Sequence, residues 1–156
     1  MSLPSRLVVA TKNADKVREV RAVLAEVAPG VELVEGLDWP DVEESGETLE
    51  ANALLKARAV AAATGLPSLA DDTGLEVAAL DGAPGVHTAR FAGPEASYAA
   101  NRRALLAALR GVADRRARFR TVVALVLPAG DEETAEGVLA GFITSSERGV
   151  GGFGYD

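Results

Sequence analysis

Two aspartates stand inside an otherwise apolar stretch of the chain and are the residues best suited to chemistry. Asp71 and Asp72 follow Leu69 and Ala70 and precede Thr73. Side chains alternate faces along a strand, so the two carboxylates should meet different environments, and at most one should share a site with another acidic segment. A charge in such a stretch needs a partner or a metal ion, because burying it bare is costly. The pattern favours a functional role over a structural turn.

A second acidic segment lies upstream, where Asp41, Glu43, Glu44 and Glu47 crowd into residues 41–47. Neighbouring carboxylates repel one another, so several in one loop often indicate a hard cation such as Mg²⁺. The alternative is a solvated surface loop, and composition alone favours that alternative.

Phosphate chemistry is suggested by Thr11, Lys12, Asn13 and Lys16, which occur where a short apolar run turns into a helical pattern. Free backbone N–H groups at a helix start attract phosphate, and a hydroxyl and a lysine strengthen the attraction. The glycines of a P-loop are absent. A helix cap followed by solvated charges explains the segment about as well.

The helix expected over residues 47–64 carries one lysine on its apolar face. Lys56 falls among Ala53 and Val60, and Asn52 lies one turn earlier on the same edge. The lysine either extends outward to solvent or points into an anionic cleft beneath the helix, which would suit phosphate. The sequence leaves both interpretations open.

The last eight residues combine glycine with aromatic side chains. Four glycines within residues 149–154 let the backbone adopt positive φ or approach a ligand closely. Phe153 and Tyr155 can stack on a base. A flexible tail is the alternative, but such a tail seldom carries two aromatics between glycines, so the pattern favours a functional loop.

The elements that must position these residues alternate between strands and helices. Apolar periodicity predicts strands at 6–11, 31–34, 118–127 and 137–144, helices at 14–28, 47–64 and 98–109, and an extended segment at 68–80 bent at Thr73 and Gly74. Residues 81–94 are expected to form a loop, and residues 129–134 a turn. The pattern indicates an α/β domain with a mixed central sheet flanked by helices.

Composition excludes several classes of function. The chain has 156 residues, one histidine, no cysteine and a formal net charge of −7. A disulfide scaffold, a thiolate metal site and a multi-histidine zinc site are therefore excluded. The negative charge argues against a nucleic-acid polymer as partner. No apolar run is long enough to span a membrane, so a soluble cytoplasmic protein is expected.

Taken together, the motifs resemble the inosine triphosphate pyrophosphatase family, also called Ham1-like. The resemblance covers essentially the whole chain, in order, and rests on these segments: ATKNADKVRE at 10–19, EANA at 50–53, KAR at 56–58, ADDTGL at 70–75, GAPGV at 82–86, ARFAG at 89–93 and GGFGYD at 151–156.

The resemblance implies an α/β fold with two lobes around a central cleft, usually in a homodimer. It also implies Mg²⁺-dependent hydrolysis of ITP, dITP or XTP to the monophosphate and pyrophosphate, which cleanses the nucleotide pool. Carried over by position, Thr11, Asn13 and Lys16 would hold the triphosphate, with Lys16 aiding catalysis. Lys12 stands where glycine is common in the family and would add a phosphate contact, and Lys56 is a further candidate from its place on the helix. Glu43 or Glu44 would bind Mg²⁺ together with Asp72, which would also be the general base. Thr73 would touch the substrate, and the nucleobase side would be lined by Phe153, Gly154, Tyr155 and Asp156.

One departure from the family concerns the end of the chain. Family members continue past this point with a further substrate lysine and a Ser-His-Arg segment that reads the purine. Residues 1–156 are therefore expected to form a single domain of this family that lacks its C-terminal segment. A Maf-like nucleotide pyrophosphatase and a nucleotide-binding module without turnover are the alternative interpretations.

Overall fold

The computed structural model describes residues 2–156 and contains nine helices and strands besides two short 3₁₀ helices. In chain order they are β1 (Arg6–Val9), α1 (Ala14–Val27), β2 (Glu32–Leu33), α2 (Leu49–Thr64), β3 (Ser68–Val77), β4 (Pro84–Gly85), α3 (Tyr98–Ala108), β5 (Arg116–Val126) and β6 (Glu132–Phe142). The 3₁₀ helices span Ala78–Leu80 and Thr88–Arg90.

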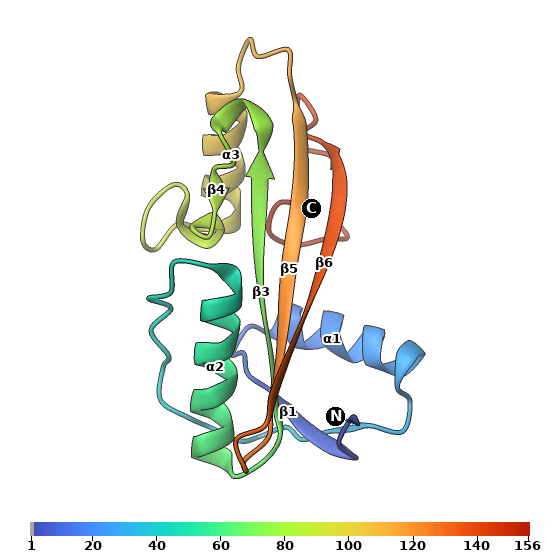
Figure 1. The fold of residues 1–156 in the computed structure, drawn as a ribbon. Helices are drawn as coiled ribbons and strands as arrows, with labels where there is room; N and C mark the ends of the chain where they lie inside the picture. The colour runs from blue at the N-terminus through green and yellow to red at the C-terminus, as the bar shows by residue number, and fades with distance from the viewer. Residues whose placement is uncertain (1) are drawn as a thin grey trace. The chain divides into compact units, whose positions relative to one another are not determined.

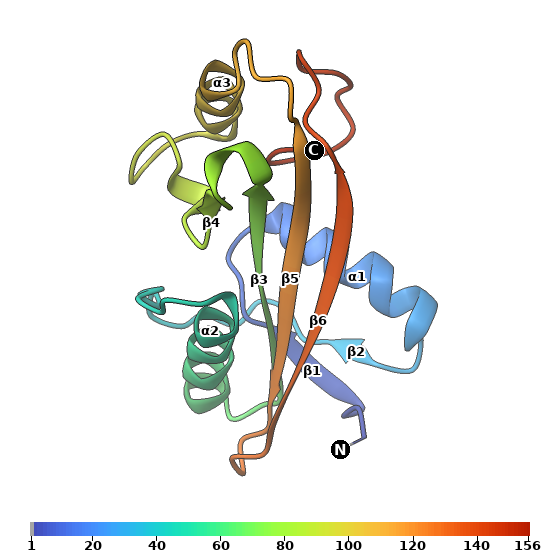
Figure 2. The same ribbon diagram turned by 45° about the horizontal axis from the view of Figure 1, so that its top comes forward.

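The strands form one mixed sheet, as the sequence predicts. Its order is β2-β1-β3-β5-β6, and β4 pairs with β3 outside that path. β1 is parallel to both β2 and β3, whereas β3 and β4 are antiparallel. Helices α1 and α2 lie on either side of β1 and β3 (Figures 1 and 2).

Local chemistry sets the ends of the helices. The side chain of Asn13 accepts a hydrogen bond from the backbone N–H of Asp15 and caps α1. Thr48 caps α2 in the same manner, so this helix begins two residues later than expected. Gly65 ends α2 with φ of 70°, a left-handed conformation that glycine adopts without a steric penalty.

The bend expected at Thr73 and Gly74 is wrong, because β3 continues through both residues as a ten-residue strand. Thr73 gains a partner across the sheet: its hydroxyl lies 2.7 Å from the hydroxyl of Thr121 on β5. Residues 81–94, expected as a loop, contain the short strand β4 and one 3₁₀ helix.

The chain divides into two compact units. Unit 1 extends to Asp72 and includes Val122–Glu136, and unit 2 comprises Thr73–Thr121 and Gly137–Asp156. Buried side chains from β1 and α2 form much of the core of unit 1, among them Leu7, Val8, Ala53 and Val60. In unit 2, Leu75 and Val77 of β3 pack with Leu105 of α3 and with Leu109, the residue that follows this helix. Within residues 2–156, no helix is long and apolar enough to cross a membrane.

Candidate active site

Asp72 is the most perturbed carboxyl group of unit 1. Its side chain is 14% exposed, and its Oδ2 atom is buried without a hydrogen-bond partner. Burial is the largest influence and, with the nearby Glu44 and Asp71 carboxylates, raises the pKa of Asp72 to about 6. Lys56 and the amide of Asn52 lower this pKa but do not offset the rise. Asp72 is therefore a buried carboxyl group, one of whose oxygens accepts no hydrogen bond.

Lys56 on α2 joins the acidic loop to the two aspartates of β3. Its ammonium group donates a 2.7 Å hydrogen bond to the backbone carbonyl oxygen of Asp71. The same nitrogen lies 3.6 Å from Oε1 of Glu44 and 3.7 Å from Oδ1 of Asp72. With a side chain only 16% exposed, Lys56 points inward rather than to solvent. Of the two interpretations of Lys56 that the sequence allowed, the structure therefore supports the inward one, in an anionic environment.

Lys16, in the first turns of α1, pairs with the other aspartate. Its Nζ lies 3.0 Å from Oδ2 of Asp71 and 2.6 Å from Oε2 of Glu19. Burial alone would lower the pKa of Lys16, but the two carboxylates raise it by more, so the amine stays charged. The alternation along β3 is as expected: the carboxylate of Asp71 meets Lys16, whereas that of Asp72 meets Lys56.

The carboxylates of Glu44 and Asp72 are chemically suited to a divalent cation. Both Glu44 and Asp72 reach one lysine nitrogen, and Oδ2 of Asp72 has an unused lone pair. Across residues 2–156, no group of three or more histidine, aspartate and glutamate side chains could hold a metal ion. Mg²⁺ needs no such cage, because it is commonly bound by one or two carboxylates, with water and substrate phosphates completing its six ligands.

The other phosphate-binding candidates lie nearer the surface of unit 1. Lys12 pairs with Asp41 at 2.8 Å and Asp38 at 3.6 Å, so it bridges to the acidic loop. The hydroxyl of Thr11 accepts a hydrogen bond from the backbone N–H of Asn13. Glu43 and Glu44 are both exposed, and Glu44 is the one whose carboxylate lies beside Lys56.

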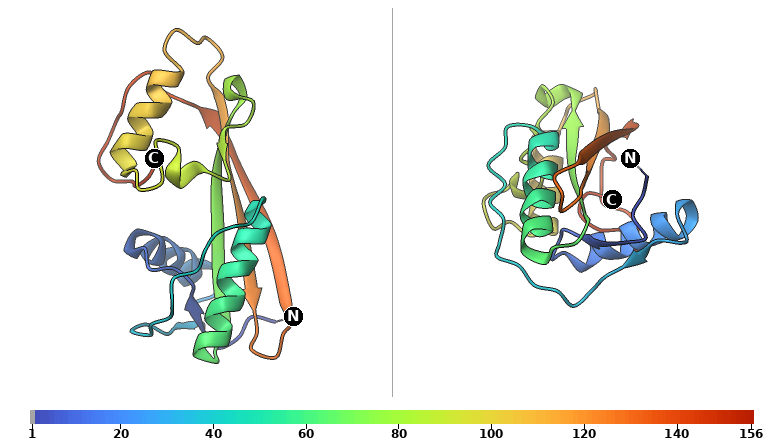
Figure 3. Two further views of the ribbon diagram at one scale, coloured as in Figure 1. Left: turned by 90° about the vertical axis from the view of Figure 1, so that its left-hand side faces the viewer. Right: turned by 60° about the horizontal axis from the view of Figure 1, so that its bottom comes forward.

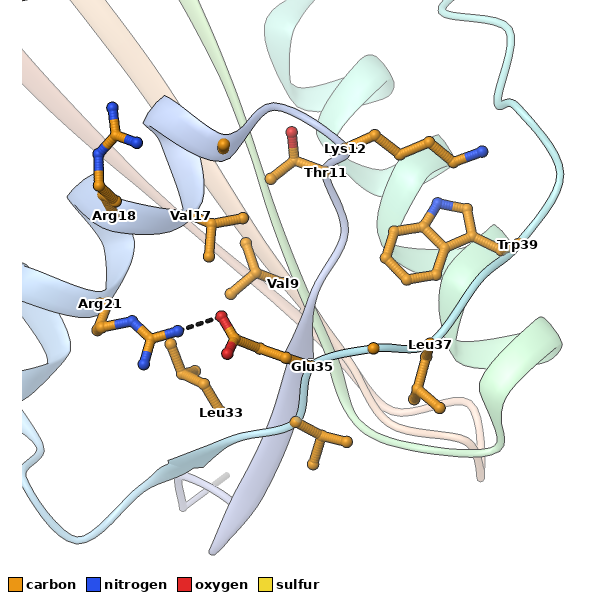
Figure 4. Close-up of a pocket in the computed structure, with 13 residues that line it drawn as sticks. Val9, Thr11, Lys12, Val17, Arg18, Arg21, Leu33, Glu35, Leu37 and Trp39 are labelled. Carbon is orange, nitrogen blue, oxygen red and sulfur yellow. Dashed lines mark hydrogen bonds and ion pairs between the residues drawn. The ribbon is translucent and has the colours of Figure 1, made fainter.

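Thr11 and Lys12 also line a separate hollow of about 390 Å³ between the start of α1 and residues 33–39 (Figure 4). Apolar side chains and Trp39 form much of its wall, and Arg21 pairs there with Glu35. Arg18 is held by Asp15. Arg18 and Arg21 are therefore paired with carboxylates, which reduces the attraction of this hollow for a triphosphate.

The candidate nucleobase residues belong to unit 2. Phe153, Gly154, Tyr155 and Asp156 line a hollow of about 860 Å³ together with α3 and the end of β6. The rings of Phe153 and Tyr98 lie 6.2 Å apart, and the hydroxyl of Tyr155 donates to the backbone carbonyl of Thr88. The C-terminal segment passes beside α3 (Figure 3, left).

Sequence reasoning missed Arg102, and it named Asn52 without the contact that this residue makes. Arg102 of α3 donates a 2.8 Å hydrogen bond to the carbonyl oxygen of Gly154, and Asn52 of α2 accepts one of 2.7 Å from the backbone N–H of Gly46. Asn52 did carry a signal, since a polar amide on the apolar face of an alanine-rich helix requires a buried partner. Arg102 carried none, because it resembles any other exposed helical arginine.

Comparison with protein families matches residues 7–156 to the Ham1 family. The chain belongs to this family. Two curated relatives, both named dITP/XTP pyrophosphatase, are 52% identical over 153 residues (Syntrophobacter fumaroxidans) and 50% identical over 155 residues (Geobacter sulfurreducens). The alignments cover 96% and 97% of this chain but 65% and 78% of the respective relatives.

Solved structures of the family have the same fold. A Ham1 protein of Coxiella burnetii matches with a TM-score of 0.83 and 39% identity, and the Staphylococcus aureus Ham1 protein with 0.80 and 38%. The matches cover 97% of this chain and 79% and 78% of those chains, respectively.

Proposed function

We propose that this chain is a nucleoside triphosphate pyrophosphatase that hydrolyses non-standard purine nucleotides, ITP, dITP and XTP, to the monophosphate and pyrophosphate. Its role is to cleanse the nucleotide pool. The observation that carries the proposal is the buried Asp72 carboxyl group near Glu44 and Lys56. One of its oxygens accepts no hydrogen bond. Relatives at about half identity bear the name dITP/XTP pyrophosphatase, which supports the same substrate class.

Asp72 is suited to act as the general base. Its pKa of about 6 leaves the carboxylate ionised at neutral pH and still basic enough to accept a proton from water. Lys16 is proposed to neutralise phosphate charge, since it is cationic and held at the start of a helix. Thr11, Lys12 and Asn13 at the same helix start are proposed as further phosphate contacts.

Mg²⁺ is the proposed cofactor, and Glu44 and Asp72 are the residues that would hold it. Glu44 is favoured over Glu43 because its carboxylate lies beside Lys56. When bound, Mg²⁺ neutralises charge on the triphosphate, which otherwise repels an attacking nucleophile. Lys56 keeps the two acidic side chains close together before any cation arrives.

In unit 2, Thr73 is proposed to contact the substrate, and residues 153–156 to form the wall that faces the nucleobase. The rings of Phe153 and Tyr155 supply apolar surface, and Arg102 fixes the backbone between them by holding Gly154. We also propose that the protein is a cytoplasmic homodimer, which cell fractionation and light scattering of the purified chain would test.

The test of the proposed function is pyrophosphate release from ITP, compared with GTP and ATP, with and without Mg²⁺. Release that requires Mg²⁺ and prefers ITP is expected. Binding of ITP without release would replace the enzyme by a nucleotide-binding module, and preference for a pyrimidine triphosphate would favour a Maf-like activity. The Asp72→Asn variant, purified identically, is the control for a contaminating hydrolase.

A further inference from the structure

The backbone of the acidic loop is held to α2 by the buried side-chain amide of Asn52. Asn52 is 1% exposed, and its Oδ1 accepts a 2.7 Å hydrogen bond from the backbone N–H of Gly46. Gly46 stands two residues after Glu44 in the chain. Because the Asn52 side chain is buried, loss of this bond would leave an unsatisfied polar group.

The contact is so close that it requires glycine on the loop side. A β-carbon at Gly46 would lie 2.6 Å from Oδ1 of Asn52 and 2.8 Å from the β-carbon of Ala51. Any larger residue must therefore displace either the Asn52 side chain or the loop, and either shift breaks the contact. The position of Glu44 thus depends on the fit between Gly46 and Asn52.

The same face of α2 also governs the partner carboxylate on β3. The amide of Asn52 lowers the pKa of Asp72, and Lys56, one turn later, lies near both Asp72 and Glu44. Asn52 thus contacts the loop that carries one acidic residue and acts on the other acidic residue itself. Lys56 acts on the two carboxylates by charge, whereas Asn52 acts on the backbone of the loop.

We propose that Asn52 is a positioning residue, which holds the Glu44 segment through Gly46 at the separation from Asp72 that a divalent cation requires. The proposal rests on the proposed function, since it assigns a purpose to the Glu44–Asp72 pair. Residues that orient metal ligands typically change metal affinity by about 10- to 100-fold when mutated.

The chain contains a matched control in unit 2. Asn101 is 2% exposed and, like Asn52, stands four residues after the residue that caps its helix. Its Oδ1 accepts from the backbone N–H of Ala92 and its Nδ2 donates to the carbonyl of Ala89, both at 2.9 Å. Asn101 therefore binds a loop to α3 as Asn52 binds a loop to α2, and it does not contact Glu44 or Asp72.

The experiment measures binding of Mn²⁺ by electron paramagnetic resonance in the presence of a non-hydrolysable ITP analogue. The variants are Asn52→Leu, Asn101→Leu and Gly46→Ala, with urea unfolding to record stability. We expect about tenfold weaker Mn²⁺ binding for Asn52→Leu and Gly46→Ala, and less than about a twofold change for Asn101→Leu, although both leucine variants lose stability. The half-saturating Mg²⁺ concentration for pyrophosphate release should shift by the same factor.

Equal weakening in the Asn52 and Asn101 variants would overturn the proposal, as would unchanged Mn²⁺ binding in Gly46→Ala. The Gly46→Ala variant leaves α2 intact, so it keeps the test decisive if Asn52→Leu fails to fold. A variant that combines Asn52→Leu with Gly46→Ala should bind Mn²⁺ no more weakly than the weaker-binding single variant, because both changes break the same contact. Mn²⁺ binding is read without turnover, so a wild-type chain that binds Mn²⁺ in this way but releases no pyrophosphate would refute the proposed function alone.

Discussion

Replacing Asp72 by asparagine should abolish turnover and, at neutral pH, make the protein more stable. In the folded state the pKa of the Asp72 carboxyl group is about 6, chiefly because burial disfavours its charge. The ordinary pKa of an aspartate in water is 3.8. The folded protein therefore binds more protons than the unfolded chain between about pH 4 and pH 6. Stability falls as pH rises through this window.

The size of the effect follows from the shift. About two pKa units at about 1.4 kcal/mol each amount to about 3 kcal/mol of stability that wild type loses between pH 4 and pH 7. Asparagine carries no charge to desolvate, so Asp72→Asn avoids the loss. Its advantage over wild type should be about 3 kcal/mol larger at pH 7.5 than at pH 4. Turnover should fall by at least about 100-fold, since the general base is gone.

Urea unfolding of both proteins from pH 4 to pH 8, in EDTA to exclude metal, measures the stability term. Asp114→Asn is the control of opposite sign, because hydrogen bonds from Arg116 lower the pKa of Asp114 to about 2. Its replacement should give no gain at pH 7.5. A difference between Asp72→Asn and wild type that does not vary with pH would refute the burial argument, and near wild-type pyrophosphate release would refute the role as base.

Three further changes test other parts of the structure. Lys16→Met should lower kcat/KM for ITP at least about tenfold, because a charge-assisted contact to phosphate is worth about 1.5–3 kcal/mol, and an unchanged value would remove Lys16 from the site. Tyr155→Phe should cost about 1 kcal/mol in urea unfolding through the lost bond to Thr88, and no loss would show that this bond contributes nothing. Arg115→Lys should lower the melting temperature markedly. The Arg115 guanidinium donates to the carbonyls of Leu109, Ile143 and Thr144, and a single ammonium group cannot reach all three. An unchanged melting temperature would contradict this.

The helices, most strands and the order of the candidate residues could be predicted from the sequence, since periodicity and capping are local properties. The alternation of Asp71 and Asp72 also follows from strand geometry alone, and their separate lysine partners confirm it. The bend expected at Gly74 failed because cross-strand contacts such as that between Thr73 and Thr121 outweigh the local preference of glycine for a turn.

Contacts between segments far apart in the sequence could not be predicted. Nothing local indicates that Lys56 selects Glu44 over Glu43, because the choice depends on how the acidic loop meets α2. The hydrogen bond from Arg102 to Gly154 spans 52 residues of chain. Such pairings are fixed by tertiary packing, and only the structure reveals them.

The two ends of the acidic loop are held by different forces, and this makes the loop respond unevenly to ionic strength. At its leading end, Lys12 and Asp41 form an ion pair whose side chains are 49% and 94% exposed, and salt screens such a pair. At its trailing end, the amide of Asn52 holds Gly46 by an uncharged, partly buried hydrogen bond, which salt does not screen. Rising salt therefore loosens the loop from the Asp41 side, while the backbone at Gly46, two residues after Glu44, stays bound to α2.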